Sequence, residues 1–153
     1  MKSPSPKITY IASSAGFGIF SFIVMASTRS LMYLYLLYYN KPTDDKITPI
    51  SITNFYIAKS IFIAPIVESI AVVIIYDILC PTFKVPRLWY LITLAILFGL
   101  LHQHALTGIV LFTIFGYQYA LFHKARGALQ AYGSIVLSHM TNNALALAVE
   151  SLS

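Results

Sequence analysis

The sequence predicts an all-α membrane protein, a polytopic helical bundle with about five transmembrane helices. Of its 153 residues, 58% are hydrophobic and only 10% are charged, whereas a soluble domain carries about 25% charged residues. The mean hydropathy is +0.77, and the apolar residues form long runs separated by short stretches rich in proline and charge. Because this length suits one domain, we expect a single integral membrane domain.

The apolar runs divide the chain into a tail, a first helix and a core. Residues 1–7 are polar and basic, so we expect a short tail there, followed by a first transmembrane helix over residues 8–39. Residues 54–150 are expected to form a four-helix core. The core helices are predicted at residues 54–79, 88–104, 109–122 and 128–149, and the loops at residues 40–53, 80–87 and 123–127.

The fourth of these five runs is the weakest membrane helix. Residues 109–122 are short for a crossing, which takes about 20 residues. The pair Thr107-Gly108 interrupts the apolar pattern just before this run. We therefore expect a short helix over residues 109–122, which Ala105 and Leu106 could lengthen at its start.

The basic balance of the chain is better explained by a membrane than by nucleic acid. The net charge is +5 and the isoelectric point is about 9.4. The lysines and arginines stand singly between apolar runs, without the basic patch that nucleic-acid binding needs. Under the positive-inside rule they place the N-terminus in the cytoplasm, and we expect an integral protein of a bacterial or archaeal plasma membrane. Cys80 is the only cysteine, which excludes an intrachain disulfide.

Four strongly polar residues stand inside the apolar runs. Glu68 lies in the second run, His102 lies near the end of the third, and His139 and Asn143 lie one helical turn apart in the fifth. Counted from a flanking loop at 1.5 Å per residue, all four lie about 15–20 Å deep in a hydrocarbon core of about 30 Å. Ionisable groups at such depth usually face a bundle interior and serve a function. We therefore predict that the four side chains form one site near the bilayer midplane.

These four side chains have the chemistry for hydrolysis by an activated water. A carboxylate facing an imidazole can hold a water and remove its proton, which suits Glu68 with His102. A second imidazole and a carboxamide can donate hydrogen bonds to an oxyanion, which suits His139 with Asn143. Six other polar residues are placed outside this set because of their helical phase, their interfacial position or the lack of a G-x-S-x-G motif. They are Asp77, His104, His123, Ser69, Ser134 and Ser138.

Three spaced motifs follow one another along the second, third and fifth runs. The first holds Glu68 with Ser69 and Val73 behind it, the second runs from Phe98 to His102, and the third reads His-Met-Thr-Asn-Asn. In this order they resemble the CPBP/CAAX-type (Abi) glutamic intramembrane proteases. The signatures of that family are Glu-Glu-x-x-x-Arg, Phe-x-x-x-His and His-x-x-x-Asn. The second and third are present, whereas Ser69 stands in place of the second Glu and Val73 in place of the Arg.

The resemblance covers residues 55–150 and implies an intramembrane endopeptidase. It assigns Glu68 and His102 to activation of the water, and His139 and Asn143 to the oxyanion site. Peptide or protein substrates of such an enzyme include prenylated CAAX tails, C-terminal sorting tags and bacteriocin-like peptides, and membrane lipid surrounds it. The joint loss of the second Glu and the Arg leaves neither charge unpaired, so we expect a divergent but active branch.

Three other functions are open at this point. Glu68, His102 and His139 can alternatively bind a divalent metal such as zinc, although no H-E-x-x-H motif is present and we favour no cofactor. The second alternative is a non-catalytic bacteriocin-immunity or scaffold protein, a role that the resemblance also implies. Such a protein needs no reacting site. A small proton or ion carrier would use the same buried acid and imidazoles.

Overall fold

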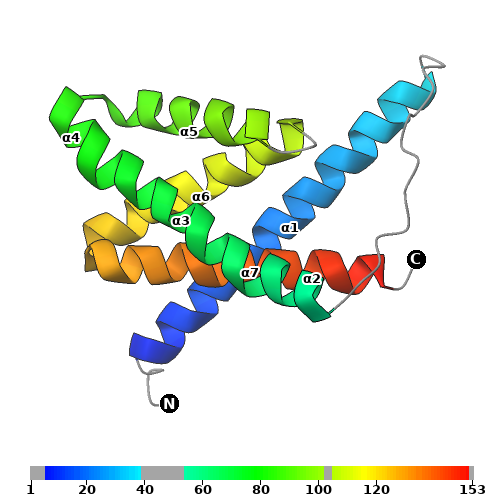
Figure 1. Cartoon of the computed structure of the whole chain (residues 1–153), viewed down its shortest axis with the longest axis horizontal. Coiled ribbons are helices and arrows are strands. Elements are labelled where there is room, and N and C mark those ends of the chain that lie inside the picture. Colours follow the sequence, from blue (N-terminus) through cyan, green and yellow to red (C-terminus); the bar gives the residue numbers. More distant parts are fainter. Residues whose placement is uncertain (1–5, 39–53, 102–104, 152–153) are drawn as a thin grey trace.

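The computed structural model describes residues 6–38, 54–101 and 105–151, and 96% of this part is helical, with no strand in it. The prediction of an all-α protein is therefore confirmed. The described ranges form five helices (Figure 1). These are α1 (Pro6–Tyr38), the second helix (residues 54–83), α5 (Arg87–Leu101), α6 (Ala105–Arg126) and α7 (Ala128–Glu150).

The second helix is continuous, but its backbone changes pitch twice. Two π-helical turns, each ending two residues before a proline, interrupt the α-helical pattern. A π-helical turn is rare and is often found at functional sites. The five segments in chain order are α2 (Asn54–Ala58), η1 (Lys59–Ile63), α3 (Ala64–Val73), η2 (Ile74–Leu79) and α4 (Cys80–Phe83).

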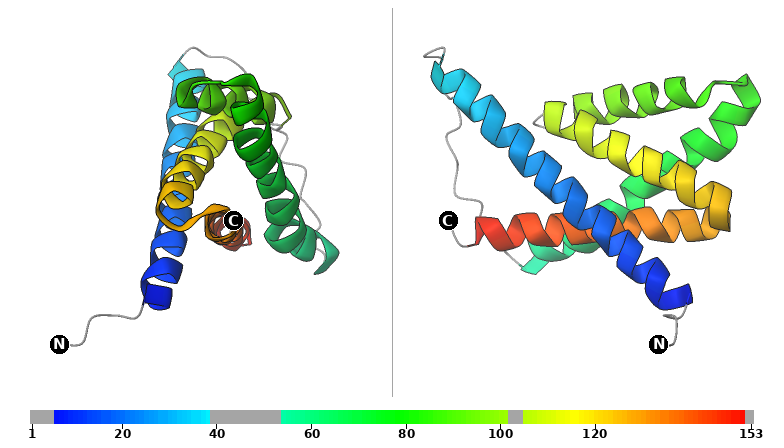
Figure 2. Two further views of the ribbon diagram at one scale, coloured as in Figure 1. Left: turned by 90° about the vertical axis from the view of Figure 1, so that its left-hand side faces the viewer. Right: turned by 180° about the vertical axis from the view of Figure 1, so that it is seen from behind.

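The helix α7 is the centre of the arrangement. It contacts α1, α6, η1 and α3, and viewed end-on it lies between α1 and the second helix (Figure 2, left). The helices α5 and α6 pack against each other (Figure 1). A buried aromatic and aliphatic core joins the second helix, α5, α6 and α7.

Several predicted boundaries agree with the structure. The helix α1 and the helix α7 match residues 8–39 and 128–149 to about the precision with which helix ends can be defined. The predicted loop at residues 40–53 lies outside the described residues, as does most of the predicted tail. The helix α5 covers the predicted third run up to Leu101.

The fourth helix extends beyond residues 109–122 at both ends, and its start agrees with the alternative in which Ala105 and Leu106 lengthen it. It begins at Ala105, so Thr107 and Gly108 lie inside it and are buried. Small residues are tolerated there because they let membrane helices approach closely. The predicted loop at residues 123–127 is also wrong. The basic residues complete α6, where cations interact favourably with the helix C-terminus, and Gly127 with φ of 86° starts the turn into α7.

The predicted loop at residues 80–87 is wrong for a related reason. The helix passes through Pro81 and ends only at Phe83. A proline lacks an N–H group and its ring crowds the preceding turn, and the π-helical turn η2 accommodates it because the Cys80 N–H bonds to the Ile75 carbonyl instead. Lys84, in the left-handed conformation with φ of 52°, then stops the helix.

The lengths and surfaces of the helices are those of a membrane protein. Within the described ranges, three helices are long and apolar enough to cross a membrane, at Thr9–Leu31, Lys59–Phe83 and Ala105–Arg126. A shorter apolar helix covers Leu88–Leu101. The second helix exposes one stripe of large apolar side chains, as expected of a lipid-facing surface. That stripe consists of Phe62, Ile63, Ile66, Val67, Ile70, Ile74 and Ile78.

Small residues allow α1 and α7 to pack closely. Ser14, Gly18, Ser21 and Met25 recur on one face of α1 at spacings of three and four, and all are buried. A Cβ atom at Gly18 would lie 2.5 Å from the Ser138 carbonyl oxygen and 2.7 Å from Thr141 Cβ. Both atoms belong to the rigid part of α7, so only glycine allows this approach.

A buried polar cluster connects α1, α6 and α7. Gln118 Nε2 of α6 donates hydrogen bonds to Ser134 Oγ at 2.5 Å and to Ser138 Oγ at 2.7 Å. The Ser14 hydroxyl of α1 donates a hydrogen bond to Ser134 Oγ at 3.0 Å. The Ser14 carbonyl accepts one from the Ser138 hydroxyl at 2.5 Å. These hydrogen bonds satisfy the buried hydroxyl groups of Ser134 and Ser138 and the buried amide nitrogen of Gln118. Ser134 and Ser138 therefore have a structural role in the helix contacts.

We predict that Gly18→Ala destabilises the protein by about 1–3 kcal/mol, because the added methyl group forces α1 away from α7. The free energy of unfolding is measured by SDS titration in mixed micelles. Gly16→Ala is the matched control, since a Cβ atom there meets nothing within 4 Å. Equal stability of the two variants would contradict the close packing.

Candidate functional site

Glu68 lies on α3 at the edge between the lipid-facing and the buried side of the second helix. Its neighbour Val67 is exposed, Ser69 is buried, and the Glu68 side chain is itself 27% exposed. This intermediate position follows from the helical period, because the buried positions 65, 69 and 72 recur on the other side. The Glu68 side chain is thus partly exposed, whereas its Oε2 atom is buried against α7.

His139 of α7 faces this carboxylate. Its Nε2 atom lies 3.6 Å from Glu68 Oε2, and its side chain is only 4% exposed. This separation is within ion-pair range and longer than a typical direct hydrogen bond. Phe115 packs at 4.8 Å and Phe112 at 6.1 Å from the imidazole, measured between ring centroids. A charge on either partner therefore lies in an apolar environment, where electrostatic interactions are strong.

Asn143 lies one turn beyond His139 and also faces the second helix. Its Nδ2 atom donates a hydrogen bond to the Ser60 carbonyl at 2.8 Å. Its Oδ1 atom accepts from Asn142 Nδ2 at 3.2 Å, and Asn142 Oδ1 accepts from Ser21 of α1 at 3.4 Å. One carboxamide proton of Asn143 is therefore engaged by the backbone of η1.

The structure relates α5 to the site through an aromatic stack. Phe98 lies parallel to Phe112 with 3.9 Å between ring centroids, and the edge of one ring in the Phe112–His139 pair meets the face of the other at an interplanar angle of 88°. His102, one turn after Phe98 in the sequence, lies outside the described residues, as does His104. The structure thus brings Glu68, His139 and Asn143 to one contact between α7 and the second helix.

A metal site at these residues remains a prediction. In the parts of the chain that the structure describes, no group of three or more His, Cys, Asp or Glu side chains could hold a metal ion. The predicted set of Glu68, His102 and His139 includes a residue beyond those parts. The carboxylate oxygen of Glu68 and the imidazole nitrogen of His139 are two of the ligand types that zinc accepts.

A second polar cluster, which we did not predict, lies farther along the second helix. Asp77 of η2 accepts a hydrogen bond from the Tyr119 hydroxyl at 2.5 Å, and its other oxygen lies 3.1 Å from His123 Nε2. Its helical phase relative to Glu68 places Asp77 outside the predicted site, and the predicted loop at residues 123–127 includes His123. An isolated acid in an apolar run usually has a partner, so Asp77 itself is the sequence signal that indicates this cluster.

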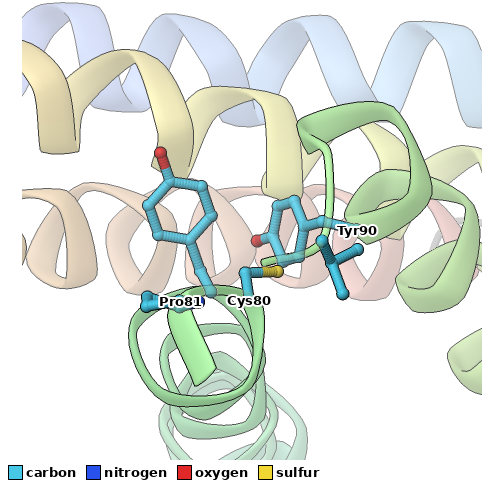
Figure 3. Close-up of a pocket in the computed structure, with 5 residues that line it drawn as sticks. Cys80, Pro81 and Tyr90 are labelled. Atoms are coloured by element: carbon cyan, nitrogen blue, oxygen red, sulfur yellow. The ribbon is translucent and has the colours of Figure 1, made fainter. Parts of the chain in front are cut away.

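A pocket of about 270 Å³ lies next to this cluster, where the second helix turns back into α5 (Figure 3). The tyrosines of the region pack edge to face, with Tyr76 at 4.9 Å from Tyr90 and 5.2 Å from Tyr119. The pocket is separate from Glu68, because nine residues of helix rise by about 13 Å. Its lining residues are Tyr76, Cys80, Pro81, Val85 and Tyr90.

Comparisons with known proteins do not identify the chain. No protein family, curated protein or solved structure matched it. The resemblance of its motifs to the CPBP proteases is therefore still an expectation, and the function is inferred from the residues themselves.

We predict that Tyr119→Phe destabilises the protein by about 1–3 kcal/mol, because it removes a hydrogen bond to the Asp77 carboxylate. The measurement is again SDS titration of the unfolding free energy. Tyr117→Phe on the same helix is the matched control, since the Tyr117 side chain is half exposed. The contact would have no structural value if both variants behaved like the unmodified protein.

Proposed function

We propose that this protein is a membrane-embedded endopeptidase in which Glu68 activates a water molecule. The observation that carries the proposal is the 3.6 Å approach of His139 Nε2 to Glu68 Oε2 across two helices. A carboxylate and an imidazole positioned in this way are the usual parts of general acid–base catalysis. Their order in the chain and the motifs around them agree with the resemblance to glutamic intramembrane proteases.

The proposed reaction needs no covalent intermediate. Glu68 takes a proton from the water as its oxygen attacks the carbonyl carbon of the scissile peptide bond. The resulting oxyanion receives hydrogen bonds from donors such as the His139 imidazole. Glu68 then passes the proton to the leaving nitrogen, the C–N bond breaks, and a carboxylate and an amine are released. His102 is assigned, by resemblance alone, to assist Glu68 with the water.

The missing residues of the first motif are compatible with this proposal. Ser69 is buried at 3% exposure, and Val73 packs against the hydrophobic core. A second carboxylate and its arginine at these positions would both require burial. Replacing a buried ionic pair by uncharged residues that pack well often leaves the stability of a protein unchanged or raises it. The fold around Glu68 therefore does not need the absent pair.

The environment of Glu68 favours a substrate that arrives through the lipid. The exposed neighbours Ile66, Val67 and Ile70 are apolar, and they offer no charged recognition surface. We therefore propose a peptide with an apolar portion, such as a prenylated tail, a hydrophobic sorting tag or a bacteriocin-like peptide. A substrate of this kind would reach the carboxylate from the side of the second helix.

The proposed orientation places the N-terminus in the cytoplasm. Tyr10 near the start of α1 donates a hydrogen bond to the Gln130 carbonyl at 2.5 Å, and the Arg126 guanidinium lies 5.7 Å from the centre of its ring. The start of α1 therefore lies beside the basic turn between α6 and α7. Basic residues gathered at one end are typical of the cytoplasmic side.

We predict that Glu68→Gln abolishes cleavage, lowering the rate by at least about 100-fold, because the amide cannot accept the proton from water. The assay uses an internally quenched farnesylated CAAX peptide, with an unprenylated apolar peptide of the same sequence, in proteoliposomes. His139→Ala and His102→Ala are expected to lose activity as well.

Ile78→Ala is the matched control, since this exposed side chain lies on the same helix about 15 Å from Glu68. Activity that survives Glu68→Gln would exclude the mechanism, and a biological protection that survives it would favour an immunity or scaffold role. Activity lost on chelation and restored by zinc would favour the metal-dependent variant. A proton flux in liposomes without cleavage would favour a carrier.

We also expect direct attack by water in a single turnover. Enzyme prepared in ordinary water is mixed with one equivalent of peptide in H₂¹⁸O, and the new carboxyl terminus is examined by mass spectrometry. Direct attack places ¹⁸O in the first product, because solvent supplies the attacking oxygen. A first product without ¹⁸O would indicate that a protein carboxylate had attacked and formed an anhydride, which water then opened at the protein's own carbonyl carbon.

A further inference from the structure

The second helix has a break in its hydrogen-bond ladder at the Ser60 carbonyl. In an α-helix this carbonyl accepts from the amide of residue 64, and in a π-helical turn from that of residue 65. The Ala64 N–H donates to the Lys59 carbonyl instead, and Pro65 has no N–H to donate. Neither of the two backbone donors is therefore available to Ser60.

Asn143 supplies the missing donor from another helix. Its Nδ2 atom lies 2.8 Å from the Ser60 carbonyl oxygen. A backbone carbonyl left unsatisfied at membrane depth is costly, because no water is present to bond it. The proline and the asparagine are thus two parts of one arrangement: the first removes a backbone donor and the second replaces it.

The hydrogen bonds around Asn143 determine which way its carboxamide points. Asn142 Nδ2 donates to Asn143 Oδ1 at 3.2 Å, and Ser21 donates to Asn142 Oδ1 at 3.4 Å. Because its oxygen is engaged on this side, the nitrogen of Asn143 is the atom that faces Ser60. The three residues form a chain of hydrogen bonds from α1 through α7 to η1.

We propose that Asn143 is a positioning residue that fixes the second helix on α7 and thereby sets the distance between Glu68 and His139. His139 precedes Asn143 by one turn on the same face of α7, and Glu68 follows the π-helical turn on the same helix. A weaker bond from Tyr132 of α7 to the Ile66 carbonyl, at 3.4 Å, lies on the other side of His139 along α7. Along α7, His139 therefore lies between two cross-links to the backbone of the second helix, and along the second helix Glu68 lies two residues beyond the nearer of them, at Ile66. This inference concerns the hydrogen bond and the helix position, and it stands whether or not the protein is a peptidase.

A double-mutant cycle with Pro65→Ala tests this role. Asn143→Ala alone is expected to raise the unfolding equilibrium constant by about 3- to 20-fold, the range for side-chain hydrogen bonds between membrane helices. Pro65→Ala gives residue 65 an N–H that can reach the Ser60 carbonyl. In that background Asn143→Ala should change the constant by less than about twofold, since the carbonyl has a second donor.

Pro81→Ala is the matched control, because Pro81 follows the other π-helical turn, η2. The effects of Asn143→Ala and Pro81→Ala are expected to be additive. If Asn143→Ala does not fold by itself, the Pro65→Ala/Asn143→Ala protein should be recovered folded from the membrane, whereas the Pro81→Ala/Asn143→Ala protein should not.

The ¹³C chemical shift of the Glu68 carboxyl group measures directly whether the surroundings of this side chain change. In a folded Asn143→Ala protein this signal is expected to move, and in Pro65→Ala/Asn143→Ala to return toward the original value. A change in overall stability alone would not move it. The proposal is overturned if the Pro65 and Asn143 effects add as in the Pro81 pair, or if the Glu68 signal is the same in all folded variants. Absence of peptidase activity would overturn the proposed function and leave this result unaffected.

Discussion

The need to satisfy polar groups away from water is the constraint on which this structure depends, and it acts most strongly on α7. This helix carries polar residues on two faces. Ser134, Ser138 and Asn142 bond to α1 and α6, whereas His139 and Asn143 contact the second helix. A helix with this composition is stable in lipid only when neighbouring helices cover both faces. Its central place in the bundle is thus a consequence of its sequence.

The second helix meets the same constraint through its prolines. Each of its two π-helical turns ends two residues before a proline, and each turn has a polar contact with a neighbouring helix. At η1 the contact is made by Asn143, and at η2 Asp77 is held by Tyr119 and His123. Glu68 lies between these two anchors. An acid that must act at a defined distance from an imidazole benefits from such attachment, because preorganised groups lose little freedom when they react.

Two of the three errors in the predicted boundaries have the same physical cause. Thr107-Gly108 and Pro81 were interpreted as helix breakers, which they are in water, where an exposed glycine or a lost amide is not compensated. In the bundle the glycine is buried within α6 and the π-helical turn accommodates the proline. The Asp77 cluster was missed for a similar reason. Its partners are contributed by α6, and helical phase within one segment does not identify partners on another.

The fold class, most of the helices and the residues that are polar in an apolar environment follow from the sequence alone, although the fourth helix has 22 residues where the apolar run has 14. Composition and periodicity carry this information, because they reflect the local backbone and the solvent around it. Only the tertiary structure decided that Glu68 faces His139 and that Asn143 bonds to the Ser60 carbonyl. Periodicity defines the face of a helix, but the rotation and height of one helix against another are set by contacts such as that of Gly18 with α7. Those contacts form only when the helices pack.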